Sequence, residues 1–139
     1  MKGYPASGLP TVYSSGPPGG DQIIVSAALA VLPTFPMLVT LPVTTGNILV
    51  ISVVAVAYAN FGVSGPQAQI YVGGVPVGAE WTRNHPHVND TATITLDYTY
   101  TVLADNPALT VELWALQAAN NWTMLAAYTS GVQVIKFGT

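Results

Sequence analysis

The stretch Thr91–Val102, TATITLDYTYTV, alternates between two kinds of side chain without interruption. One parity carries apolar residues from Ala92 to Val102, and the other carries threonines and a single acid, Asp97. Because successive side chains of a β-strand point to opposite faces, this pattern predicts a strand with one core face and one polar face. A solvent-facing strand usually carries more charged residues. We therefore expect part of the threonine face to lie near another chain in an assembly.

Outward from this strand, short apolar stretches separated by turn signals predict about eight strands and no helix. The most apolar of them, Ile48–Ala59, is shorter than the roughly 20 residues of a membrane-spanning helix. Its valines and isoleucines instead indicate a strand buried on both faces, at the core or at a subunit interface. Further strands are expected at Gln22–Leu32 (whose alanines also allow a short helix), Met37–Thr44, Ala68–Val72, Val75–Gly78, Leu109–Leu116, Trp122–Tyr128 and Val132–Phe137.

Proline and glycine set the expected boundaries of these strands. Pro42 restricts its strand to a sheet edge or a bulge, because proline cannot donate a hydrogen bond to a neighbouring strand. Loops are expected at Asn60–Pro66, Trp81–Asp90 and Ala104–Pro107. This series of strands suits an all-β fold, an antiparallel jelly-roll sandwich of about eight strands that occupies residues 21–139.

Residues 1–20 differ from the rest, since twelve of them are glycine, proline or serine. Such a run favours an extended arm without a core of its own. Four large apolar or aromatic residues are spaced along it and could attach it to another surface: Tyr4, Leu9, Val12 and Tyr13. The composition leaves three arrangements open. The arm is folded back on its own domain, held by a neighbouring molecule, or laid across another subunit.

The chain carries very little charge. Charged residues make up 6% of it and hydrophobic residues 50%, against about 25% charged residues in an average soluble domain. Its three basic residues cannot form a track for nucleic-acid phosphates or for an anionic membrane, so neither is an expected partner. The absence of cysteine excludes disulfides and thiolate zinc sites. The first ten residues lack the apolar region of a secretory signal.

Few residues offer chemistry, so we expect no enzyme and no cofactor. The run Asn84-His85-Pro86-His87 is the one cluster that resembles a metal site, and the alternative is an ordinary polar loop. Asp97 and Glu112 could face each other as a pair of glycosidase carboxylates if their strands were neighbours. The alternative is that both acids supply surface charge.

Large aromatic side chains mark the candidate contact residues. Trp114 lies beside Glu112 on the outward parity of its strand, Trp122 follows a turn, and Trp81 opens a polar loop. Such rings can contact a partner or stack on sugars, and a second sheet or the arm could equally cover them. The candidates for a partner or glycan contact are Trp81, His85, His87, Trp114 and Trp122.

The block DTATITLDYTYTVLADNPALTVELWALQ, followed by a short strand and SGVQVIKFG, carries a family resemblance over roughly residues 90–138. It resembles the C-terminal part of small jelly-roll proteins of tailed bacteriophage virions, which are commonly trimeric. These include capsid decoration (cement) proteins and the knobs of head and tail fibres. The pattern is also similar to that of the trimeric jelly rolls that include tumour-necrosis-factor-like domains.

The resemblance implies a viral structural protein on the capsid exterior of a virion. It would bind the major capsid protein, stabilise the assembled head and form a homotrimer. Its arm, through Tyr4, Leu9, Val12 and Tyr13, would lie in grooves between capsid subunits. The alternative within the same family is a receptor- or glycan-binding knob of a head or tail fibre. The lack of a coiled-coil or collagen-like shaft favours the decoration protein.

Overall fold

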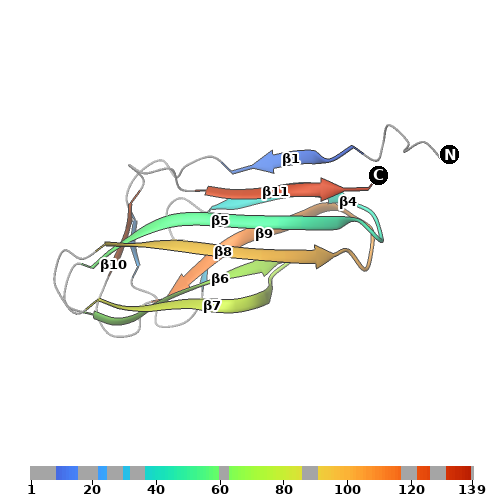
Figure 1. Cartoon of the computed structure of the whole chain (residues 1–139). Coiled ribbons are helices and arrows are strands. Elements are labelled where there is room, and N and C mark those ends of the chain that lie inside the picture. The colour runs from blue at the N-terminus through green and yellow to red at the C-terminus, as the bar shows by residue number, and fades with distance from the viewer. Residues whose placement is uncertain are drawn as a thin grey trace.

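The structure, a computed structural model, describes residues 9–15, 22–24, 30–31, 37–59, 63–85, 91–116, 122–125 and 131–138. Within these ranges the chain forms eleven strands and no helix (Figure 1). Among the same residues, no helix is long and apolar enough to cross a membrane. The strands are β1 (Thr11–Ser14), β2 (Gln22–Ile24), β3 (Ala30–Val31), β4 (Leu38–Val43), β5 (Ile48–Ala59), β6 (Val63–Val72), β7 (Val75–His85), β8 (Thr91–Thr101), β9 (Asn106–Leu116), β10 (Trp122–Leu125) and β11 (Gly131–Phe137).

The strands form two sheets. The six-stranded sheet has the order β1-β11-β5-β10-β2, with β8 on the other edge of β5, and the five-stranded sheet has the order β3-β9-β6-β7, with β4 also on β9. Every described pairing is antiparallel. Figure 1 shows β1, β11, β5 and β8 side by side, with β4, β9, β6 and β7 in the layer behind.

Three pairs of short strands lie end to end along one neighbour. β10 pairs with Val56–Ala59 at one end of β5, and β11 pairs with Ile48–Val54 at the other. In the same way β1 and β2 lie along β11 and β10, and β3 and β4 lie along β9. If each such pair is counted as one strand, the described residues form eight strands in two sheets of four.

The order of these eight strands identifies the topology. Numbered along the chain, one sheet runs first, eighth, third, sixth, and the other runs second, seventh, fourth, fifth. This is the arrangement of a jelly roll, in which the chain crosses repeatedly between two antiparallel sheets. The expected all-β jelly-roll sandwich is confirmed.

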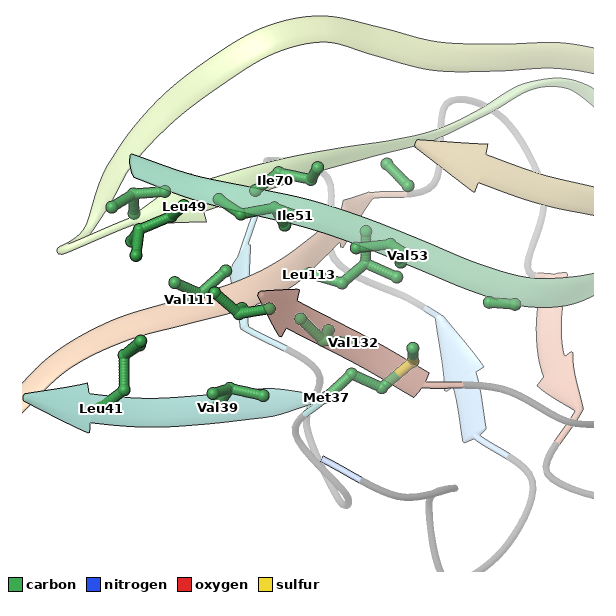
Figure 2. Close-up of a cluster of buried hydrophobic side chains, with 14 of the residues drawn as sticks. Met37, Val39, Leu41, Leu49, Ile51, Val53, Ile70, Val111, Leu113 and Val132 are labelled. Atoms are coloured by element: carbon green, nitrogen blue, oxygen red, sulfur yellow. The ribbon is translucent and has the colours of Figure 1, made fainter. Parts of the chain in front are cut away.

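The core fills the space between the two sheets. On β5 the inward parity, from Leu49 to Ala57, is fully buried, and it packs against the inward parity of β9, which includes Val111 and Leu113 (Figure 2). On β8, Ala92 and Ile94 are buried, as is Val102 directly after the strand. Tyr98 and Tyr100 pack against the core, while the threonines and Asp97 are exposed. The alternation in Thr91–Val102 therefore produces one core face and one polar face, as predicted.

β5 begins and ends where the sequence predicted it, but the chain itself buries only one of its faces. The outward parity, from Ile48 to Tyr58, is half-buried or exposed, and Val54 is 41% exposed. The sequence predicted that β5 is buried on both faces, at the core or at a subunit interface. The core of the single chain buries the inward face alone.

Three expected loops are partly strand. β6 begins at Val63, because Gly65–Pro66 falls at a register shift between Ser64 and Gln67, where a bulge accommodates proline. β7 continues to His85, since pairing with β6 holds residues that read as a polar loop. β9 begins at Asn106 rather than Leu109, again beside a register shift.

Two further predictions concern β2, β3 and β4. The stretch Gln22–Leu32 contains β2 and β3, which belong to opposite sheets, so it is not one strand; residues 25–29 lie outside the described residues. Pro42 lies at the register shift between Leu41 and Val43, in a strand whose described pairing is with β9 alone. The expectation of an edge or a bulge at Pro42 is confirmed.

Part of the N-terminal segment belongs to the sandwich. Thr11–Ser14 pairs with β11, so for residues 9–15 the chain takes the arrangement folded back on its own domain. Tyr4 lies outside the described residues, as do 16–21. The division into an arm at 1–20 and a domain at 21–139 stays a prediction.

Candidate functional site

The outer face of the six-stranded sheet carries rows of apolar residues in register. Val12 lies opposite Ile135, which lies opposite Val50, and the row ends at Thr99 on β8. A neighbouring row joins Phe137 and Ile48 to another threonine of β8. We call the apolar part of this surface the apolar sheet face; it consists of Val12, Ile48, Val50, Val54, Val56, Ile135 and Phe137.

The apolar sheet face is accessible in the single chain. Val12 is 55%, Val54 41% and Phe137 39% exposed, and the other members are half-buried. Among the described residues of this outer face, Asp97 is the one carboxylate or ammonium group, in a polar row with Ser52 and Gln133. This polar row separates the apolar residues into two groups, and the threonines of β8 border both groups.

One end of the sandwich is hollowed by two adjoining depressions. The larger, of about 480 Å3, is lined by Pro42, Val43, Thr44, Asp105, Asn106, Pro107 and Lys136. The smaller, of about 280 Å3, lies between the β6–β7 turn and the β8–β9 loop and shares Asp105 and Asn106 with the first. Polar side chains of a weakly charged protein thus gather at this end.

Asn47 fixes the β4–β5 turn at this end. The Thr44 backbone N–H donates to Asn47 Oδ1 at 2.8 Å. The Val102 N–H donates to the Asn47 carbonyl at 2.9 Å, and the Gly46 N–H donates to the Val102 carbonyl at 2.8 Å. Asn47 is buried, and its hydrogen bonds offset the cost of burying a polar side chain. The turn and the β8–β9 loop are thereby held together.

Asp105 makes a second link between the same two loops. Its Oδ1 accepts hydrogen bonds from the Thr45 N–H at 2.7 Å and from Thr45 Oγ1 at 3.0 Å. The backbone N–H and then the hydroxyl of Thr45 stabilise the charged form, so they hold the pKa of Asp105 below its ordinary value.

Replacing Asp105 by asparagine is expected to lower stability at neutral pH and to matter less in acid. Because the folded state lowers the pKa of Asp105, its carboxylate stabilises the fold above the ordinary value of 3.8, and this contribution is lost as pH falls through the folded pKa. Thermal unfolding of both chains between pH 7 and pH 3 measures the difference. A difference that stays constant over this range would contradict the assignment.

Lys136 lies on the inward parity of β11 and is buried. Its ammonium donates to the Pro42 carbonyl at 3.0 Å and lies 5.7 Å from the centre of the Tyr13 ring. A carbonyl and an aromatic face both stabilise a cation. Lys136 therefore joins β11 to β4 and to β1, and it brings a positive charge to the wall of the larger depression.

Tyr71 and Trp114 form an aromatic pair on the outer face of the five-stranded sheet. Their rings are stacked, with centroids 3.7 Å apart and an angle of 8° between the planes. Trp114 Nε1 is buried, and no acceptor lies within hydrogen-bond distance among the described residues. One face of the Trp114 ring is thus covered by Tyr71.

The structure does not gather the predicted aromatic and histidine contacts into one platform. Trp81 pairs with the buried Ala68 and packs against the core, so it faces inward while Trp114 faces outward. Trp122 begins β10 in the other sheet. His85 ends β7, and His87 lies outside the described residues.

The hypothetical pair of catalytic carboxylates is not formed. Asp97 belongs to β8 of the six-stranded sheet and Glu112 to β9 of the five-stranded sheet. Both are on the outward parity of their strands, so they lie on opposite outer faces of the sandwich. Among the described residues no group of three or more histidine, aspartate or glutamate side chains could hold a metal ion.

Sequence reasoning missed the polar end of the sandwich. Ala104–Pro107, which contains Asp105, is predicted only as a loop, no role is assigned to Asn47, and Lys136 is a single basic residue in the last strand. Two turn signals containing Asn or Asp could have indicated loop contacts, since these side chains bond to backbone N–H groups. Nothing in the sequence pairs Thr45 with Asp105.

Comparison with known proteins gives likeness of structure alone. No family model matches the chain, and no curated protein matches it. Over 95% of its length it is similar to VP2 of infectious bursal disease virus, in a subviral particle, with a TM-score of 0.57 and 10% identity. The chain spans 33% of that VP2 chain.

Two other solved structures show the range of this likeness. The Eiger TNF protein of S. frugiperda has a TM-score of 0.55 and 7% identity, covering 92% of each chain. The PRD1 vertex protein P5 has a TM-score of 0.45 and 11% identity, covering 91% of this chain and 95% of its own; that likeness is too loose to carry an argument. At these identities the first two similarities show the fold alone, which the chain shares with VP2 of infectious bursal disease virus and with the Eiger TNF protein.

Proposed function

We propose that this chain is a structural protein of a virion, which binds the exterior of an assembled capsid and stabilises it. The observation that carries the proposal is the exposed apolar sheet face, which a structural protein would bury against a neighbouring chain of the particle. Large apolar patches on soluble proteins mark contact sites. The fold shared with VP2 and the resemblance over residues 90–138 to phage decoration proteins support the same role.

Binding only to the assembled shell would stabilise that shell by mass action. Burial of apolar surface, at about 25 cal/mol per Å2, supplies the driving force. If the chain is a homotrimer, as the resemblance implies, three arms would bind together and raise the avidity for the major capsid protein. Neither binding to the shell nor its stabilisation needs a cofactor or a catalytic group.

The placement of β1 divides the four arm residues. Tyr13 packs against the chain's own core and beneath Lys136, whereas Leu9 and Val12 are exposed. Tyr4 precedes the described residues. We therefore assign the capsid contact to the segment before β1, with Leu9 as its described member.

A deletion that ends before β1 tests this assignment. Removal of residues 1–10 leaves the β1–β11 pairing in place, so we expect unchanged thermal unfolding and at least tenfold weaker binding to capsids. Binding is measured by co-sedimentation with particles purified from the source of this sequence. Removal of residues 1–20 is the comparison, and it should also lower stability because it exposes the edge of β11. Undiminished binding after the shorter deletion would overturn the role of the arm.

The alternative, a receptor- or glycan-binding knob, gives a different result in the same assay. It predicts binding of the full chain to host cells or a glycan array and no binding to capsids. Its residues would be Trp81, Trp114 and Trp122, with His85 and His87. Because Trp81 packs against the core and Trp114 lies on the outward parity of β9, Trp114→Ala is the better substitution for this test.

A further inference from the structure

The sequence of β5 is that of a strand buried on both faces, but its outward face is accessible in the structure. Strands that are buried on both faces read as continuous apolar runs, and ILVISVVAVAYA is such a run. Its inward parity is fully buried, but its outward parity is half-buried or exposed, and Val54 on it is 41% exposed. The outer face thus has a buried strand's composition, but the part of the chain that the structure describes supplies no layer that covers it.

The neighbouring strands extend this property across the sheet. In the row Val12, Ile135, Val50 and Thr99, four adjacent strands contribute residues without charge. The row containing Val54 runs from Gly131 to Thr95 and also lacks charge. Between these two rows lies a polar row of Ser14, Gln133, Ser52 and Asp97, whose one charge is on the edge strand β8. β-branched residues that are adjacent across strands pack well on a pleated surface. The surface is therefore broad, with apolar rows on both sides of one polar row.

The size of the surface suits a stable protein contact. A twelve-residue strand at about 3.3 Å per residue and four strands about 4.8 Å apart give a face of roughly 600–700 Å2. Two such faces would bury roughly 1,200–1,400 Å2 in total, which reaches the range of specific interfaces, about 1,200–2,000 Å2. A contact of this size does not require another surface of the protein.

A second copy of the same face is a suitable occupant. Two sheets pack face to face when both present apolar residues, at a separation of about 10 Å. In a self-contact each copy supplies the uncharged surface that the other needs. Asp97 lies in the β8 row at the border of the face rather than among its apolar residues, so its desolvation is not required.

We propose that the apolar sheet face packs against a second copy of this chain. The inference rests on the proposed function only in that an assembled structural protein must meet its own copies; it adds the surface of that contact. Because two identical faces in contact close a two-fold pair, the proposed oligomer is a dimer and not the homotrimer that the resemblance implies. The threonine side of β8 then lies at the border of the interface, where hydroxyl groups can remain hydrated.

A lysine at the centre of the face tests the proposal. We expect the full chain to sediment as an oligomer at micromolar concentration, and Val54→Lys to raise the dissociation constant at least 100-fold. Val75→Lys is the matched control, because Val75 is 60% exposed on β7 of the other sheet, and it should leave the oligomer unchanged. Val12→Lys, at an exposed site of the same face, is the second variant if Val54→Lys fails to fold.

The outcomes separate this proposal from the proposed function. A full chain that is monomeric throughout, or an oligomer that both face variants leave intact, overturns the self-contact. If Val54→Lys keeps the oligomer but loses co-sedimentation with capsids, the face belongs to the shell contact and the self-contact is wrong. If Val54→Lys loses the oligomer and the full chain never binds capsids, the self-contact stands and the capsid role fails.

Discussion

The free energy of unfolding is expected to fall by about 2–5 kcal/mol when Ile51 is replaced by alanine. Ile51 is fully buried in the cluster between the sheets, among residues that include Val53 and Leu113 (Figure 2). The substitution removes buried methylene and methyl groups and leaves a cavity that the two sheets cannot close without moving apart. Because whole domains are stable by about 5–15 kcal/mol, this is a large fraction of the total.

Equilibrium unfolding in urea measures the effect of Ile51→Ala. Leu103→Ala is the control, since Leu103 is 81% exposed in the β8–β9 loop and its truncation should change the free energy by less than about 0.5 kcal/mol. Similar losses for the two variants would contradict the placement of Ile51 in the core.

Gly78→Ala is expected to cost about 1–3 kcal/mol, the sum of a backbone term and a contact term. Gly78 has φ of +70°, where a side chain strains the backbone, and an added Cβ would lie 3.0 Å from Tyr98 Cδ1. Gly78 is on β7 and Tyr98 on β8, so this contact lies where the edges of the two sheets meet. The added methyl group would therefore push β7 and β8 apart.

Gly74→Ala separates the two terms of this prediction. Gly74 has a similar φ of +80°, but nothing lies within 4 Å of an added Cβ. Its substitution should therefore carry the backbone term alone, and thermal or urea unfolding should show a smaller loss than for Gly78→Ala. Equal losses would mean that the β7–β8 approach is not close.

The strands with unbroken patterns could be predicted from the sequence. β8 alternates strictly and β5 is one apolar run, so each signal is local to its own residues. The signal fails where pairing overrides local preference. The polar end of β7 is a strand because β6 supplies its hydrogen bonds, and Gly65–Pro66 is tolerated because it falls at a bulge.

The candidate surfaces depend on contacts between residues distant in the sequence. The threonine parity of β8 indicated a covered face, yet the position of Val12 beside Ile135 and Val50 follows only from the register of three strands. Thr45 and Asp105 meet at the end of the sandwich although they are 60 positions apart. Periodicity in one segment contains no information on such pairings.

Electron microscopy of virus particles tests the proposed virion role most directly. Particles purified from the source of this sequence would be imaged with the full chain and with the chain that lacks residues 1–10. The account predicts added density on the outer surface of the capsid with the full chain and little or none with the shortened chain. Bare capsids after incubation with the full chain, together with its binding to host cells or glycans, would contradict it.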